Sequence, residues 1–299
     1  MKEYGLAFVL GGGGARGALQ VGAIRALLEA GITPNILVGT SIGAANAAFL
    51  AIKGVNLEGV ELLEQVWKTA PAADLMPANY LWLTVRALFQ RPATYPAYRI
   101  RDFFVAQGLY PELRFREINS IRLYMVAADL AAGRAKVFGD EPEETVLDGV
   151  LASTALPPWV SPLHKHGMEL IDGGIVSNLP IATAIERGAA RIIALDLADP
   201  RDLPENGRGF GLFMERLFYT IEHHQLQMEL QVAKSSGVEV RHVPLYGKQA
   251  VPLWEFRHTS ELIDSGFQIM KREMESWKTQ SKPGMAQTLK MALKRWLNE

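Results

Sequence analysis

Two periodicities alternate along the first fifty residues. Short continuous apolar runs at "YGLAFVL" (4–10) and "NILVGT" (35–40) predict buried strands, whereas residues 18–30 and 41–54 repeat apolar positions at helical spacing. One face of the first helix collects Leu19, Ala23, Ala26, Leu27 and Ala30. Gly31 follows as its expected cap. Strands and helices that alternate across short turns predict a mainly parallel sheet covered by helices on both faces.

The same alternation returns after residue 120. Further strands are expected at "RLYMVAADL", "AAGRAKVF", "MELID", "RIIALDLA" and "VEVRHVPL". Further helices are expected at 143–156, 180–189, 210–234, 261–278 and 287–296. A turn at Gly133 joins the first two of these strands. Pro157 and Pro158 stop the helix before them, and Pro180 suits a first helical turn.

The alternation breaks between the second helix and Arg122. Residues from about 57 to 115 are rich in proline and aromatic side chains and lack a clean strand pattern, so we expect a helical insertion over one edge of the sheet. No repeat or linker divides the chain. We therefore expect one domain over residues 1–280, followed by an amphipathic helix over 281–299.

Composition excludes several classes of protein. Of the 299 residues, 48% are apolar, which is enough for a sizeable core. The formal net charge of −1 provides no basic field for a nucleic-acid partner. The absence of cysteine excludes disulfides and thiol nucleophiles and is compatible with a cytoplasmic location. No run approaches the roughly 18–20 apolar residues of a membrane span.

A glycine-rich turn, "GGGARG" from Gly12 to Gly17, lies between the first strand and helix. A dinucleotide site would need an acidic residue at the end of the next strand, which reads "NILVGTS", and a P-loop would need Lys and Ser or Thr after the last glycine. Both requirements fail. The remaining interpretation is an oxyanion hole, in which backbone amides of this loop, unshielded by side chains, donate to developing negative charge. Arg16 could meet a substrate anion or brace this loop.

A second turn in the same context supplies a nucleophile. "GTSIG", from Gly39 to Gly43, is a G-x-S-x-G sequence between a strand and a helix, a turn that exposes Ser41. The two glycines remove clashes with the strand and the helix. The amide of Ile42 would be a further oxyanion donor.

Ser41 needs a base that accepts its proton. The histidines are His164, His166, His223, His224, His242 and His258. Any histidine after Asp172 fits the order Ser, acid, His of α/β-hydrolases, but none follows a strand in a clear turn. Asp172 is the better candidate, because it ends an apolar strand and precedes Gly173 and Gly174. The carboxyl end of a strand is where open α/β sheets place their sites, although a plain Asp-Gly turn remains the alternative.

The motifs "GGGARG", "GTSIG" and "DGG", in this order, resemble those of the patatin-like phospholipases, as does "ASTALPPWVSP" before the last of them. The resemblance covers about the first 200 residues. It implies a three-layer α/β/α fold and a Ser–Asp dyad that hydrolyses acyl esters of lipids without a metal, cofactor or catalytic histidine. Carried over by position, Ser41 is the nucleophile and Asp172 the base, and Gly12, Gly13, Gly14 and Arg16 lie in the oxyanion loop.

The resemblance leaves three functions open. The expected one is a lipid acyl hydrolase of the phospholipase A or lysophospholipase type. An acyltransferase would share the acyl-enzyme intermediate, and a lipid-binding module would carry an idle site. The oligomeric state is open as well.

Two features bear on the lipid substrate. Acyl specificity is expected in the aromatic insertion, with Tyr80, Trp82, Leu83, Phe89, Tyr95 and Tyr98 as candidates. The last helix places Met285, Leu289, Ala292, Leu293 and Trp296 on one face. That pattern is typical of an interfacial anchor, which would give peripheral membrane contact. It is also the pattern of a terminal helix docked on its domain, which is the favoured interpretation.

Overall fold

The computed structural model describes residues 5–69, 94–157, 160–199, 201, 210–253 and 255–280. These residues contain one eight-stranded sheet in the order β5-β6-β3-β2-β1-β7-β8, with β4 also paired to β3. Its strands are β1 Gly5–Leu10, β2 Ile36–Thr40, β3 Arg122–Asp129, β4 Arg134–Phe138, β5 Leu163–Lys165, β6 Met168–Asp172, β7 Ala189–Asp196 and β8 Glu239–Pro244.

Five neighbouring strands, from β3 through β2, β1 and β7 to β8, run parallel. The other three are antiparallel: β4 and β6 pair with β3, and β5 pairs with β6. The chain moves from β1 outward to β2 and β3 on one side, whereas β7 and β8 lie on the other side. The strand order therefore reverses beside β1, and such a switch point opens a crevice at the carboxyl ends of the strands.

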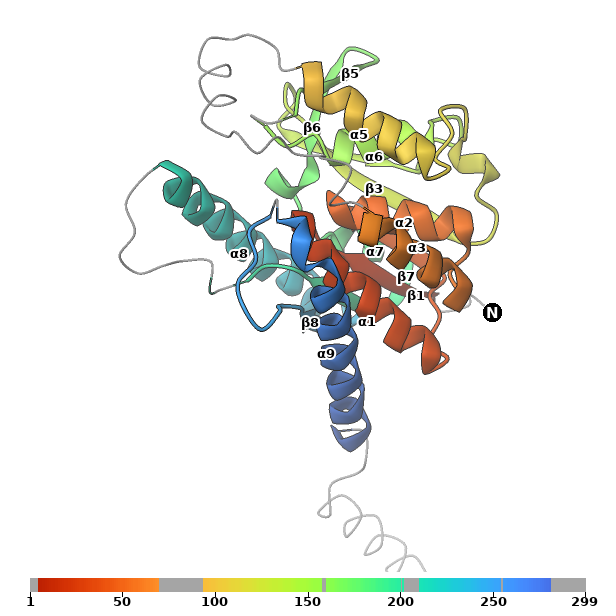
Figure 1. Cartoon of the computed structure of the whole chain (residues 1–299), viewed down its shortest axis with the longest axis vertical. Helices are drawn as coiled ribbons and strands as arrows, with labels where there is room; N and C mark the ends of the chain where they lie inside the picture. Colours follow the sequence, from red (N-terminus) through yellow and green to blue (C-terminus); the bar gives the residue numbers. More distant parts are fainter. Residues whose placement is uncertain are drawn as a thin grey trace, which may run out of the picture.

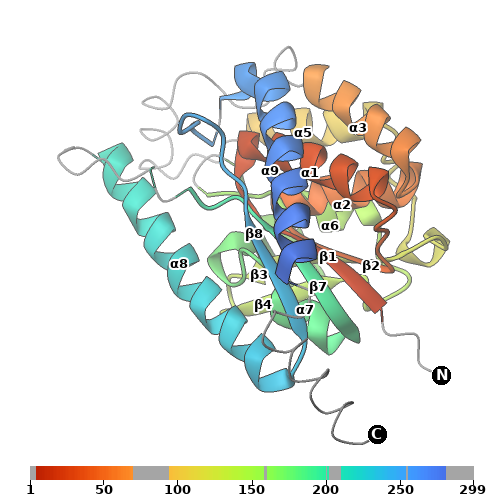
Figure 2. The same cartoon turned by 90° about the horizontal axis from the view of Figure 1, so that it is seen from below.

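Helices cover both faces of the sheet (Figures 1 and 2). Their bounds are α1 Gly17–Glu29, α2 Ile42–Lys53, α3 Leu57–Thr69, α5 Thr94–Ala106, α6 Val146–Ser153, α7 Ile181–Glu186, α8 Phe210–Ser236 and α9 Thr259–Gln280. Strand side chains alternate between faces, so Phe8 and Leu10 pack with α1, α2, α3, α6 and α9, whereas Ala7 and Val9 pack with α7 and α8. The predicted three-layer α/β/α fold is confirmed.

The segment expected as an insertion over one sheet edge is arranged differently where it is described. Its first helix, α3, packs against α1 and α2 and so belongs to a face of the sheet, and α5 packs on α6. The reason is a long apolar side of α3, which includes Val60, Leu63 and Trp67 in the core. Short β5, which pairs with β6 in a hairpin, is a strand that the apolar pattern did not indicate.

Several predictions lie outside the described residues. They include the C-terminal amphipathic helix over 281–299 and the proposed acyl-binding aromatics between 80 and 89. The side chains of Tyr95 and Tyr98 are likewise not described. None of the helices in the described ranges is long and apolar enough to cross a lipid bilayer.

Candidate active site

Ser41 occupies a strained turn between β2 and α2. Its φ of 54° and ψ of −126° lie where a non-glycine residue rarely sits, at a cost of about 1–3 kcal/mol. The flanking glycines make the turn feasible. A Cβ on Gly43 would overlap the carbonyl oxygen of Leu10, and one on Gly39 would collide with the backbone of Gly43. The helix therefore begins directly against the strand ends, with the serine at the apex.

The Ser41 hydroxyl donates a hydrogen bond of 2.6 Å to Oδ2 of Asp172. The other carboxylate oxygen of Asp172 accepts the amide of Gly174 at 2.8 Å. Asp172 is 3% exposed, and burial raises its pKa to about 6, although the hydrogen bonds from Ser41 and Gly174 favour the ionised form and limit the rise. The structure thus holds a buried, basic carboxylate against the serine hydroxyl.

Asp172 reaches Ser41 for a different reason from the one that predicted it. Because β6 runs antiparallel to β3, its carboxyl end points toward the edge opposite the site. The strand is only five residues long and enters from beyond the carboxyl edge, so its last residue pairs with Ala127. Thr40 pairs with Val126 on the other side of β3, which places Ser41 and Asp172 at one level.

Some amides of the glycine loop hydrogen-bond within the fold, and others face the cavity beside Ser41. The amide of Gly12 donates to the carbonyl of Asn178 at 3.2 Å, and that of Ala15 to Leu253 at 2.6 Å. Within the described ranges, the amides of Gly13, Gly14 and Ile42 meet no acceptor, and all three residues line the cavity beside Ser41. Gly12 also lines this cavity, but its amide secures the loop.

Arg16 is 6% exposed, does not line the cavity beside Ser41, and lies near enough to Asp199 for its charge to lower the pKa of that carboxyl. Burial raises the pKa of Asp199, but hydrogen bonds with Arg201 and the nearby charges of Arg201 and Arg16 lower it overall. Of the two roles considered for Arg16, its position fits bracing of the loop.

The remaining predicted glycines serve packing around the dyad. Gly17 leaves room for Ile42 and Trp67, and Gly173 passes against the carbonyl of Val126. Gly174 supplies the amide that Asp172 accepts and lines the cavity.

The end of α6 holds both Ser41 and Asp172, and the sequence motifs did not reveal this. The amide of Ser41 donates to the hydroxyl of Ser153 at 2.8 Å, and that hydroxyl donates to the carbonyl of Val126 at 2.6 Å. Two residues later, the carbonyl of Ala155 accepts the amide of Asp172 at 2.9 Å. The only sequence signal for this support was the segment "ASTALPPWVSP", which contains Ser153 and Ala155 but does not indicate which residues they contact.

Helix α8 secures the loop that follows Asp172. The side chain of Gln225 accepts a hydrogen bond of 2.9 Å from the amide of Asn178 and donates one of 2.6 Å to the carbonyl of Ile175. One turn later, the Glu229 carboxylate accepts hydrogen bonds from the hydroxyl of Ser177 at 2.5 Å and from the amide of Ala182 at 2.6 Å. This loop in turn holds the amide of Gly12 through the carbonyl of Asn178, so α8 supports both Asp172 and the glycine loop.

Ser41 and Asp172 open into a cavity of about 150 Å³, which we call the catalytic cavity. Its apolar walls are Ile100, Phe104, Leu156, Val160, Ile175, Leu253 and Phe256. No histidine of the described ranges lines it. His242, which fits the α/β-hydrolase order, instead lies 2.8 Å from Asp196. The geometry favours a dyad over a triad.

Comparison with known proteins agrees with this geometry. The family model for patatin-like phospholipase matches residues 8–185, which include the glycine loop, Ser41 and Asp172. The chain belongs to the patatin-like phospholipase family. Phospholipases are lipid ester hydrolases, so the family accounts for a serine beside an apolar cavity.

The relatives of this patatin-like chain are much longer proteins. Patatin-like phospholipase domain-containing protein 7 of Rattus norvegicus is 32% identical over 211 residues, which make up 68% of this chain and 14% of that protein. Lysophospholipase NTE1 of Cryptococcus neoformans is 26% identical over an alignment of 299 positions. The alignment covers 94% of this chain and 18% of that protein. The chain spans less than a fifth of either relative.

A solved structure shares the patatin-like fold. Human GIVD cytosolic phospholipase A2, in complex with methyl gamma-linolenyl fluorophosphonate and terbium chloride, gives a TM-score of 0.51 at 12% identity. The match covers 90% of this chain and 59% of that one, and it shows the likeness of the fold.

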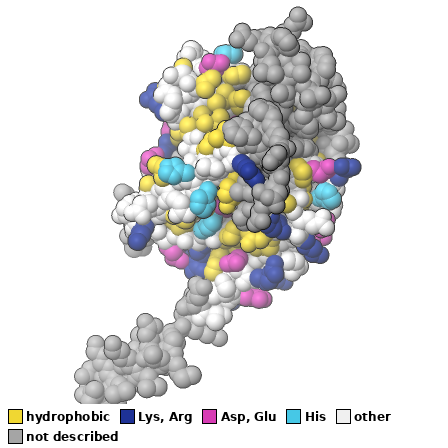
Figure 3. Space-filling view, turned by 90° about the vertical axis from the view of Figure 1, so that its left-hand side faces the viewer, with side chains coloured by type: hydrophobic (Ala, Val, Ile, Leu, Met, Phe, Trp, Pro, Cys, Tyr) yellow, Lys and Arg dark blue, Asp and Glu magenta, His cyan; other side chains and the backbone are white. Residues whose placement is uncertain are grey.

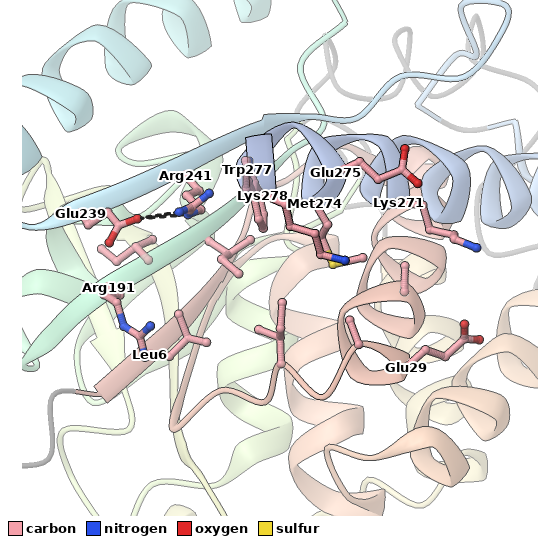
Figure 4. A pocket seen from close by; sticks show the side chains of 15 residues that line it. Leu6, Glu29, Arg191, Glu239, Arg241, Lys271, Met274, Glu275, Trp277 and Lys278 are labelled. Carbon is pink, nitrogen blue, oxygen red and sulfur yellow. Dashed lines mark hydrogen bonds and ion pairs between the residues drawn. The ribbon is translucent and has the colours of Figure 1, made fainter. Parts of the chain in front are cut away.

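A larger cavity in the described part of this patatin-like chain lies away from Ser41 and Asp172. It measures about 850 Å³ and is bounded by α9, the end of α1 and the amino-terminal halves of β7 and β8 (Figure 4). Charged side chains surround it, and Arg241 is paired with Glu239 at 3.0 Å and stacked over Trp277. It lies at the edge of the sheet opposite Ser41 and contains no serine nucleophile.

Proposed function

We propose that this chain is a serine acyl hydrolase that cleaves fatty-acyl ester bonds of lipids, as a phospholipase A or lysophospholipase does. The observation that carries the proposal is the 2.6 Å hydrogen bond from Ser41 to Asp172 at the wall of an apolar cavity. With its pKa raised to about 6, Asp172 is ionised at neutral pH and is a stronger base than an ordinary aspartate.

In the first half of the reaction, Ser41 Oγ attacks the ester carbonyl carbon while its proton passes to Asp172 Oδ2. The carbonyl electron pair moves onto oxygen, and the resulting oxyanion accepts hydrogen bonds from the amides of Gly13, Gly14 and Ile42. When the pair returns, the bond to the alcohol oxygen breaks, and the departing alcohol takes the proton from Asp172. The acyl group is then an ester of Ser41.

The second half repeats these steps with water as the nucleophile. Asp172 accepts a proton from the attacking water, the same amides hold the second oxyanion, and its collapse releases the fatty acid. The proton returns from Asp172 to Ser41 Oγ. Each oxyanion donor of this kind is worth about 2.7–4 kcal/mol of barrier in other enzymes.

The test is hydrolysis of lysophosphatidylcholine and of chromogenic esters by the wild type, Ser41→Ala and Asp172→Asn. Loss of activity in both folded variants, with Ser41 labelled by a fluorophosphonate only in the wild type, supports the dyad. Asp196→Asn is the matched control, because Asp196 also ends a strand but pairs with His242. Retained activity in Asp172→Asn would exclude this mechanism. Transfer of the acyl group to added alcohols would assign an acyltransferase.

We also propose that the chain contacts a lipid surface peripherally. Apolar side chains interspersed with histidines lie on the face shown in Figure 3. On α8, Leu217, Met228 and Val232 are exposed, and Ile175 at the catalytic cavity is 37% exposed. Sedimentation with phosphatidylcholine vesicles should carry the wild type down and leave Leu217→Ser/Met228→Ser in solution. Equal sedimentation of both would refute this contact.

A further inference from the structure

A smaller apolar cavity adjoins the catalytic cavity. It measures about 80 Å³, and we call it the inner cavity. Ile42, Phe104 and Phe256 line both cavities and form the neck between them. Beyond this neck the inner cavity is enclosed by α2, α3 and the end of α5. Its position places it directly behind the residue that follows the serine nucleophile.

The walls of the inner cavity offer almost nothing to a polar ligand. Its deep lining includes Ala45, Phe49, Leu63, Val66 and Leu109. Asn46 is buried there, but its amide nitrogen donates to Gly17 and Gln20, and its carbonyl accepts the indole of Trp67 at 2.9 Å. Half-buried Gln107 is a further polar side chain of the lining. The rest of the lining is apolar or has its buried polar atoms paired, which favours a hydrocarbon occupant.

We infer that the inner cavity receives the distal end of the fatty acyl chain whose ester carbonyl lies at Ser41. This inference rests on the proposed acyl hydrolase function. The chain would leave the carbonyl, pass the neck at Ile42 and follow one face of α2. Ile42, Ala45, Asn46 and Phe49 are spaced at i, i+3, i+4 and i+7, so they form a continuous wall.

The length of this wall sets the acyl preference. From Ile42 to Phe49 the helix rises about 10 Å, the length of roughly eight chain carbons. The inner cavity, at about 80 Å³, holds roughly the last three of them, and the others lie in the neck and the catalytic cavity. Phe49 and Leu63, 5% and 3% exposed, close the far end in the core. Each methylene that enters the cavity improves kcat/KM by up to about fourfold, and this gain ends when the chain reaches Phe49.

The test narrows the cavity from two different helices. Ala45→Leu fills it from α2, and Val66→Phe fills it from α3. Leu62→Phe is the matched control, because Leu62 is exposed on α3 and points outside the cavity. The substrates are p-nitrophenyl esters with acyl chains of two, four, eight and twelve carbons. The readout is the ratio of kcat/KM for the eight-carbon ester to that for the two-carbon ester.

We expect this ratio to fall at least tenfold in both narrowing variants and to match the wild type in Leu62→Phe. An unchanged ratio in both narrowing variants would overturn the inference, even where overall activity falls. Decanoate binding to Ser41→Ala by calorimetry gives a readout free of chemistry, and Val66→Phe in that background should weaken it at least tenfold. Decanoate binding with a wild type inert on every ester would refute the hydrolase and leave the cavity assignment standing.

Discussion

The backbone amide of Ser41 donates a hydrogen bond of 2.8 Å to the hydroxyl of Ser153, which lies 112 positions later in the chain. Ser153 is fully buried, and its own proton goes to the carbonyl of Val126 on β3. A strained residue persists only where its surroundings hold it. The Ser153 hydroxyl therefore joins the serine turn to the strand that also pairs with Asp172.

Replacing Ser153 should show whether its hydroxyl positions Ser41 for catalysis without affecting substrate binding. Ser153→Ala leaves a buried amide at Ser41 without its acceptor, which costs about 1–3 kcal/mol of unfolding free energy. We expect kcat to fall by about ten- to a hundredfold, since a small misplacement of a nucleophile is costly, while KM changes little. Urea unfolding and ester kinetics measure both effects.

The control for that variant is Ser235→Ala, which removes a solvent-exposed hydroxyl bonded to its own helix. It should leave stability and kcat close to the wild type. A Ser153→Ala protein with wild-type kcat would show that the turn holds its geometry without this hydrogen bond.

Asp172→Asn should stabilise the protein while it abolishes activity. The unfolded carboxyl releases its proton near pH 3.8, whereas the folded one holds it until about pH 6. Between these values the folded chain binds the extra proton, so wild-type stability falls as pH rises, by up to about 3 kcal/mol at pH 7. Asparagine has no such charge. The melting temperature of Asp172→Asn should exceed that of the wild type at pH 7, and the difference should shrink toward pH 4.

The same pKa predicts the pH dependence of catalysis. Only ionised Asp172 can accept the proton of Ser41, so kcat/KM should rise with pH and level off above an apparent pKa of about 6. The measurement is the pH–rate profile of a soluble ester from pH 4 to 8. A midpoint near 4 would mean that Asp172 is solvated in the free enzyme.

Gly14→Ala tests whether the glycine loop must approach its neighbours so closely. Gly14 has a φ of +54°, and an added Cβ would overlap the carbonyl oxygen of Leu253. Gly133 has a φ of +62° with open space around it, so Gly133→Ala carries the backbone strain alone, about 1–2 kcal/mol. We expect Gly14→Ala to lose at least tenfold more kcat than Gly133→Ala. Equal kinetics would indicate that the Gly14 amide does not serve the oxyanion.

Local sequence was enough to identify the turns and the periodic elements. Four consecutive glycines and a G-x-S-x-G turn indicate a backbone that passes its neighbours too closely for a Cβ, and helical or strand periodicity shows within a few residues. For that reason α1, α2 and β2 lie where the pattern placed them. Ser41 and Asp172 were likewise identifiable, since each stands in a short motif at the end of an apolar run.

Tertiary structure alone decided how those motifs act together. The antiparallel direction of β6 and its register with Ala127 bring Asp172 to Ser41, and pairing register depends on contacts between residues far apart in the chain. The same holds for the amide of Gly12, which donates to the carbonyl of Asn178, and for Arg16, whose charge lowers the pKa of Asp199. The support from Ser153 and the shape of the inner cavity arise only when separate elements pack. Each of these contacts joins residues that are far apart in the chain, so the sequence around either residue does not indicate it.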